Sequence, residues 1–140
     1  MTHVTATELG ELLHRASGSF ARRGLAGFAE HGLSPARVRL VVAVGETPGI
    51  RMRDLADQLG VTARAVTPLV DGLEAEGLML RNPDPADRRA FRLRLTEAGE
   101  SLQAVISDLQ ERVSSDIFGA LDQSQRDQLA ELLRKLIAGI

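Results

Sequence analysis

The hydrophobic period of the sequence changes between residues 53 and 95, and this change limits the folds that the chain can adopt. Residues 53–59 and 62–76 carry apolar side chains at the three- and four-residue spacing of helices. Gly60 between them suits the left-handed turn that closes a helix. From residue 78 onward apolar and polar side chains alternate, which is the period of a strand. A short helix, a glycine turn, a longer helix and a two-stranded hairpin are therefore expected in this order.

The expected hairpin consists of two alternating segments and a turn. Residues 82–87 (NPDPAD) have the composition of a proline-stiffened turn. Arginines, including Arg92 and Arg94, are expected on the outer face, where they contact a partner molecule or only solvent. The opposite, apolar face is expected to consist of Leu78, Leu80, Phe91, Leu93 and Leu95.

Helical signals flank this region on both sides. Residues 5–8 (TATE) form a capping box, and the helix that they open is expected to end near residues 31–32. Residues 38–44 (VRLVVAV) taken alone could form a strand, but Ser34 and Pro35 before them are a helix start and favour a helix. Two further helices are expected to begin at the caps Thr96 and Asp122. The chain is therefore expected to be mainly α-helical with a small β-hairpin.

Composition excludes several classes of protein. The chain has 140 residues and no cysteine, which removes disulfides, thiolate metal sites and cysteine nucleophiles. The spacing of His3, His14 and His31 is not that of a metal site, so neither a metal nor a cofactor is expected. No nucleophile elbow or glycine-rich phosphate loop is present, so we expect no enzyme. No apolar run is long enough to span a membrane and no signal peptide is visible, so a cytoplasmic location is expected.

Charge is placed unevenly along the chain. The formal net charge is −2, yet residues 34–95 hold ten arginines and eight acidic residues, a net of +2. Arginine suits the bidentate recognition of phosphate and guanine. Coding bias in a GC-rich genome is the simpler explanation for the number of arginines, so only the placement of particular arginines is informative.

This order of elements with a cationic hairpin is that of a winged helix-turn-helix, which we assign to residues 34–96. In such a domain the second helix of the pair lies in the DNA major groove, and the hairpin reaches the neighbouring minor groove. Arg64 is the best candidate to read a guanine, although it could instead contact phosphate, and Thr67 could contact a thymine methyl group or a phosphate. The outer face at the start of this helix is expected to present Thr62, Ala63, Arg64, Thr67 and Pro68. The two helices are expected to be locked together by Leu55, Ala56, Leu59, Val61, Val66 and Leu69.

Residues 55–99 resemble the MarR family of bacterial transcription factors. The most specific matches are Asp87-Arg88-Arg89 and the later Leu95-Thr96-Glu97-Ala98-Gly99. The resemblance implies that Arg89 enters the minor groove while Asp87 supports it through a carboxylate–guanidinium pair. Arg88 is expected to meet a phosphate. Sequence-specific binding to double-stranded DNA is therefore the expected function.

Pro68 departs from what a recognition helix needs. It is about the sixth helical residue, and its missing N–H leaves the carbonyl of Arg64 without its usual partner. We expect either a bend of the helix or an irregular first turn.

The helices outside the winged region carry more apolar stripe than that small domain can cover. A homodimer formed by residues 1–33 and 97–140 would bury these stripes, and the family resemblance also implies dimerisation. A dimer would read a near-palindromic operator whose half-sites lie about 10 base pairs apart.

The resemblance also implies a small aromatic or anionic effector, bound between the dimer helices and the winged domain. Its candidate residues are His14, Arg15, Phe20 and Arg37, for which packing and surface charge are the simpler interpretation. The leading hypothesis is a repressor that such a ligand releases from DNA. The alternative is a dimeric helical interaction or small-molecule-sequestering protein that has lost DNA binding.

Overall fold

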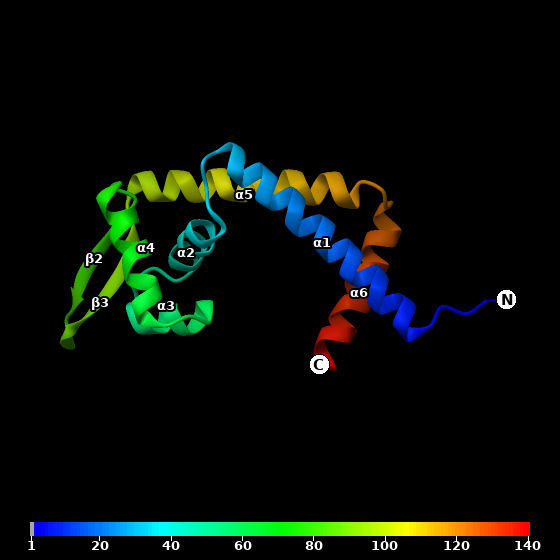
Figure 1. Cartoon of the computed structure of the whole chain (residues 1–140), viewed down its shortest axis with the longest axis horizontal. Helices are drawn as coiled ribbons and strands as arrows, with labels where there is room; N and C mark the ends of the chain where they lie inside the picture. The colour runs from blue at the N-terminus through cyan, green and yellow to red at the C-terminus, as the bar shows by residue number, and fades with distance from the viewer. Residues whose placement is uncertain (1) are drawn as a thin grey trace. The chain divides into compact units, whose positions relative to one another are not determined.

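The computed structural model describes residues 2–140 and is mostly helical, with a small antiparallel sheet (Figure 1). This confirms the expected fold class. In chain order the elements are α1 (Ala6–Glu30), α2 (Pro35–Glu46), β1 (Ile50–Arg51), α3 (Met52–Leu59), α4 (Ala63–Ala75), β2 (Met79–Asp84), β3 (Asp87–Leu95), α5 (Glu97–Phe118) and α6 (Gln123–Ala138).

The chain divides into two compact units. Residues 25–109 form the first, here called the winged unit. Residues 2–24 and 110–140 form the second, here called the helical unit. The boundaries fall inside α1 and α5. The division of labour between residues 34–96 for DNA and the remainder for dimerisation concerns function and stays a prediction.

The local signals of the winged unit act as the sequence predicts. Ser34 caps α2, where its Oγ accepts a hydrogen bond from the Arg37 amide at 3.3 Å. Residues 38–44 are therefore helical, not a strand. Gly60 closes α3 with φ 68°, a left-handed conformation that side chains other than glycine rarely adopt. The cap at Thr62 follows directly and opens α4.

The sheet has a strand that the sequence does not predict. Its order is β1-β3-β2, with Ile50 paired to Leu93 and Arg51 to Arg92. Two residues carry no periodic signal, so β1 could not be recognised. The hairpin strands are also longer than expected, because β2 continues through Asp84 and only residues 85–86 connect it to β3.

The predicted inner face of β2 is wrong. Met79 is 1% exposed and points into the core, whereas Leu80 is 50% exposed. Met79 pairs with Leu95 across the sheet, and residues paired in this way share a face. Methionine and leucine are similarly apolar, so alternation alone could not fix the phase.

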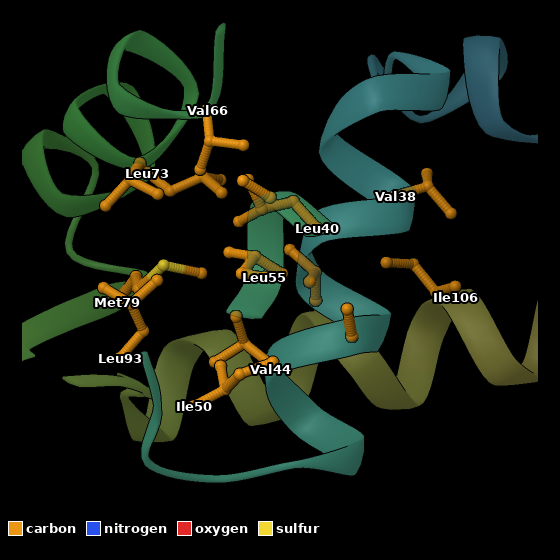
Figure 2. Packing of buried hydrophobic residues seen from close by; sticks show 14 of the residues in the cluster. Val38, Leu40, Val44, Ile50, Leu55, Val66, Leu73, Met79, Leu93 and Ile106 are labelled. Atoms are coloured by element: carbon orange, nitrogen blue, oxygen red, sulfur yellow. The ribbon is translucent and has the colours of Figure 1, made fainter. Parts of the chain in front are cut away.

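The core of the winged unit joins α2, α3, α4 and the sheet. Figure 2 shows Leu55 of α3 between Leu40 of α2 and Met79 of β2, with Val66 and Leu73 of α4 above them. The predicted helix-pair contacts are confirmed for Leu55, Ala56 and Val66, but Val61 is wrong because it is 40% exposed in the turn. Buried apolar side chains of this core are Phe28, Leu33, Val38, Leu40, Val41, Ala43, Val44, Ile50, Leu55, Ala56, Val66, Val70, Leu73, Met79, Leu93 and Ile106.

The base of the hairpin is fixed to the start of α5. The Thr96 hydroxyl donates to the Gly77 carbonyl at 2.6 Å and accepts from the Gly99 amide at 3.0 Å. A Cβ at Gly99 would lie 2.0 Å from the Leu78 carbonyl oxygen, so glycine is needed there. The motif at residues 95–99 therefore holds the ends of β2 and β3 against α5.

The helical unit has a different character, because none of its described side chains is buried. The predicted caps are present: Thr5 Oγ1 accepts from the Glu8 amide at 3.1 Å, and Asp122 forms a capping box with Gln125. Phe20 and Phe118 pack with ring centroids 6.2 Å apart. Exposed apolar side chains of this unit are Val4, Leu9, Leu12, Leu13, Phe20, Leu132, Leu136, Ile137 and Ile140.

Candidate nucleic-acid interface

The first turn of α4 presents a capped and exposed helix N-terminus. Thr62 Oγ1 accepts a hydrogen bond from the Ala65 amide at 3.2 Å. The side chains of Thr62, Ala63 and Arg64 are exposed. Amides at a helix start attract anions, so this turn offers backbone donors beside the Arg64 guanidinium.

Pro68 lies inside α4, which continues as one helix from Ala63 to Ala75. The first turn also keeps its regular bond from the Val66 amide to the Thr62 carbonyl. Of the two expected alternatives, the irregular first turn is therefore wrong, and the bend of the helix stays a prediction. Thr67 is half-buried and its hydroxyl donates to the Ala63 carbonyl at 2.9 Å, so its methyl group is the part left to face a partner.

The turn between β2 and β3 with the first residues of β3, here called the wing tip, presents Arg88 and Arg89. Both side chains are exposed. The expected carboxylate–guanidinium pair between Asp87 and Arg89 is wrong, since no such pair exists among residues 2–140. Asp87 Oδ1 accepts instead from the Arg89 backbone amide at 3.0 Å. An aspartate two residues before an amide readily closes such a turn. Asp87 therefore shapes the backbone that carries Arg89 and leaves the guanidinium free.

The wing tip and the start of α4 lie toward the same end of the winged unit. In Figure 1, α4 runs up the page and β2 returns down it to the tip. Three residues separate the end of α4 from β2, which makes this reversal tight. One end of the unit therefore carries Arg64, Arg88 and Arg89.

Ion pairing separates these three arginines from others of the winged unit. Among residues 2–140, no ion pair involves Arg64, Arg88 or Arg89. Four other arginines are paired: Arg37 with Glu76, Arg81 with Asp71 and Glu74, and Arg51 and Arg92 with Asp84. Exposed cations without an internal partner are the ones available to an external anion.

Arg92 and Arg94 differ from each other, although the sequence gives them the same expectation. Arg92 is half-buried and donates to the Gly49 carbonyl at 3.2 Å, so it acts within the protein. Arg94 is exposed. Phe91, expected on the apolar face, is 36% exposed and lies under the Arg81 guanidinium at 5.6 Å.

Asp84 is a feature that the sequence reasoning missed. It is 2% exposed, and its Oδ2 lies 2.8 Å from Arg51 Nε and 3.4 Å from Arg92 Nε. Its Oδ1 accepts from the Ala86 amide at 3.0 Å. This hydrogen bond, with the charges of Arg51 and Arg92, holds the pKa of Asp84 below its usual value against the opposing effect of burial.

The predicted effector residues have varied surroundings. His14 and Arg15 line a hollow of about 510 Å³ on α1, together with Leu12 and Arg22. Phe20 packs on Phe118. Arg37 belongs to the winged unit, where it pairs with Glu76. The effector site stays a prediction.

Two other kinds of site find no support in the part of the chain that the structure describes. No three His, Cys, Asp or Glu side chains among residues 2–140 are grouped so that they could hold a metal ion. Over the same residues, no helix has both the length and the apolar character needed to cross a membrane.

Sequence comparisons agree with the geometry. The sequence model described as "MarR family" matches residues 33–91. The uncharacterized HTH-type transcriptional regulator YkoM of Bacillus subtilis is 27% identical over 135 residues, which cover 96% of this chain and 86% of YkoM.

Solved structures share the fold. A MarR family protein from Bacillus stearothermophilus superposes with a TM-score of 0.86 at 22% identity, covering 99% of this chain and 97% of that one. The transcriptional repressor CouR, solved in complex with a 23-mer DNA duplex, has a TM-score of 0.76 at 27% identity, with 97% of this chain and 99% of CouR covered.

Proposed function

Because residues 33–91 match the MarR family model and YkoM is 27% identical to this chain, we propose that the chain is a MarR-family transcriptional regulator. It binds a near-palindromic DNA operator as a homodimer and represses transcription until a small ligand releases it. The observation that carries the DNA contact is the set of exposed, unpaired arginines at one end of the winged unit. Arg64 at the capped start of α4 reads a base in the major groove. Arg89, with Arg88 on a phosphate, enters the adjacent minor groove. Such a protein acts in the cytoplasm.

The dimer is supported by the exposed stripes of the helical unit. Leu132 is 64% exposed and Ile137 is 66% exposed on α6, and Leu9 is 58% exposed on α1. Each large apolar side chain gains about 1.5–3 kcal/mol when it is fully removed from water. A second copy of this chain, covering the stripes about a two-fold axis, supplies that burial and aligns two winged units with two half-sites.

The effector is an aromatic or anionic small molecule held in the helical unit through His14, Arg15 and Phe20. Such a ligand shifts the population between two separations of the winged units, which requires a different affinity for each. Benzoate is a suitable probe. It is expected to raise the melting temperature of the wild-type protein and not that of Arg15→Ala, whereas equal shifts would remove Arg15 from the site.

A salt titration tests DNA binding. With random duplex, the logarithm of the binding constant should fall linearly with the logarithm of salt concentration, with a slope of about −0.9 for each phosphate neutralised. A slope near zero would contradict the proposal.

Two arginine substitutions separate the roles of the two contacts. Arg89→Ala should weaken binding to all sequences, whereas Arg64→Ala should relax discrimination at one base position by about 1–3 kcal/mol. Arg23→Ala, which removes an exposed arginine from α1 in the helical unit, is the matched control. If both test variants bind like this control, the assignment of the contacts is wrong.

A protein that has lost DNA binding and acts through its helices or a sequestered ligand is the second candidate. It is favoured by the net charge of only +2 over residues 34–95. Four arginines of this region are also partly neutralised by internal pairs. The same salt titration decides between the two functions.

A further inference from the structure

Asp84 is a buried carboxylate beside the wing tip that none of the proposed DNA contacts uses. Its side chain is 1% exposed, while those of its partners Arg51 and Arg92 are 45% and 42% exposed. An unpaired carboxylate in such a place would be strongly destabilising. Asp84 is tolerated because two guanidinium groups and a backbone amide face it.

The three partners of Asp84 come from three different parts of the wing. The sheet order is β1-β3-β2, so Arg51 reaches across from one edge strand to Asp84 on the other. Arg92 on the central strand lies beside Arg51 in the register and also contacts the carboxylate. The Ala86 amide belongs to the turn at the tip. One side chain therefore joins both edges of the sheet and the turn.

Beyond the short strand β1, the hairpin has no third strand among residues 2–140 to hold it in place. This strand pairs with β3 only at residues 92–93, so residues 87–91 have β2 alone as a neighbour. A two-stranded ribbon by itself is only marginally stable in water. The register is also irregular between Pro83 and Asp84, and irregularities of this kind disrupt the ladder locally. The direction of the tip is thus weakly determined by backbone pairing.

We propose that Asp84 is a positioning residue for DNA binding, which with Arg51 and Arg92 fixes the direction of the wing and so places Arg88 and Arg89 on the duplex. This inference rests on the proposed function. Asp84 itself touches no DNA. The cross-strand partner of Asp84 is Asp87, whose carboxylate accepts from the Arg89 amide. The position of Asp84 therefore affects that of Arg89 through one residue pair of the β2–β3 ladder.

The DNA affinity of an Asp84 variant would change in the opposite direction if Asp84 served only to neutralise Arg51 and Arg92. Removal of the carboxylate would then free Arg51 and Arg92 for phosphate contacts, and DNA affinity would rise. The two interpretations therefore predict opposite changes for the same variant.

The test is Asp84→Asn, measured as affinity for random duplex against salt. Asparagine keeps an acceptor for the Ala86 amide and removes the charge that holds both arginines. We expect about a tenfold loss of affinity at low salt and a salt slope that is shallower by about one unit for each phosphate that the wing no longer neutralises. Base discrimination by α4 should not change. Asp57→Asn, the same substitution at an exposed position of α3, is the matched control and should keep the wild-type slope.

A double mutant shows whether Asp84 acts through Arg89. Arg89→Ala should weaken binding much less in the Asp84→Asn protein than in the wild type, because the arginine is already misplaced. Full additivity of the two effects would overturn the inference, as would Asp84→Asn binding with wild-type or higher affinity and an unchanged slope. A general loss of stability would not by itself make the effects of Asp84→Asn and Arg89→Ala on DNA binding non-additive. Thermal melting checks whether stability is lost.

Arg51→Gln provides a second variant that leaves the buried position intact. It should reproduce the shallower slope, and it should have little effect in the Asp84→Asn background. If the wild-type chain shows no salt-dependent binding, the proposed function fails and the inference fails with it. If wild type and Arg89→Ala behave as proposed while Asp84→Asn and Arg51→Gln match Asp57→Asn, only the inference fails.

Discussion

The winged unit and the helical unit solve the problem of burying apolar surface in different ways. The winged unit packs α2, α3, α4, the sheet and parts of α1 and α5 around a shared core, in which Leu40, Leu55 and Val66 are 0% exposed (Figure 2). The helical unit has apolar side chains of the same kinds, yet none of its described side chains is buried. One unit therefore carries its own core, whereas the other leaves an apolar stripe exposed.

The largest effect is expected from the loss of a buried leucine in the core of the winged unit. Leu55→Ala removes a fully buried side chain and should lower the free energy of unfolding by about 2–5 kcal/mol, because a cavity remains. Urea unfolding at several protein concentrations measures this. Leu80→Ala, at a position 50% exposed, is the control and should change stability by about 0.5 kcal/mol or less. Equal losses for the two variants would contradict the described core.

The stripe of the helical unit should matter for association rather than for folding of the winged unit. Ile137→Glu places a charge on the exposed apolar face of α6. Self-association should weaken by about 10- to 100-fold, as expected from losing one buried side chain worth roughly 1.5–3 kcal/mol. Sedimentation velocity measures the change. Gln128→Glu introduces the same residue at an exposed polar position of α6 and should leave the dimer intact. A wild-type chain that is monomeric at every concentration would refute the contrast.

Replacement of Pro68 tests how much the proline inside α4 lowers the free energy of unfolding. The residue is exposed inside α4, so Pro68→Ala restores an amide for the Arg64 carbonyl without disturbing the core. The free energy of unfolding should rise by about 1–3 kcal/mol, up to the usual cost of an interior proline. Thermal unfolding followed by circular dichroism checks this. A variant less stable than wild type would mean that α4 is already adapted to the proline ring.

The smallest effect is expected from the charge on Asp84, since both partner arginines are about half-exposed. The pKa of this carboxyl is lowered in the folded state, first by the Ala86 amide and then by Arg51 and Arg92. The stability that it contributes is therefore present above the unfolded pKa of an aspartate and is lost as the pH falls through the lower, folded value.

The difference in unfolding free energy between wild type and Asp84→Asn should consequently be constant from neutral pH down to the ordinary range of aspartate. It should shrink only in stronger acid. Urea unfolding as a function of pH provides the measurement. A difference that disappears already between pH 7 and 6 would show that the carboxyl is not stabilised in its charged form.

Much of the fold could be predicted because its signals are local. Ser34, Thr62, Thr96 and Asp122 begin helices, and Gly60 ends one, through contacts within a few residues. Such contacts depend on chain-neighbouring chemistry that a sequence displays directly. The position of the candidate interface followed from the same local order of elements.

Two of the errors originate in contacts between distant segments. The phase of β2 was set by packing against the core, which placed Met79 inside and Leu80 outside. Asp84 stands in a stretch of turn-forming residues, yet it is buried because Arg51, 33 positions earlier, reaches it across the sheet. An aspartate between two prolines gives no hint of such a partner. The role of Asp87 differed for a local reason, since its carboxylate accepts from the backbone amide two residues later rather than from a guanidinium.

Selection of bound duplexes from a random pool tests both the DNA contact of the winged unit and the pairing of two chains. A self-sufficient winged unit paired through the helical unit should enrich two inverted half-sites whose centres lie about 10 base pairs apart. The Arg64→Ala protein should lose the preference at one position of each half-site. Enrichment of a single unrepeated site, or of no sequence at all, would contradict the account.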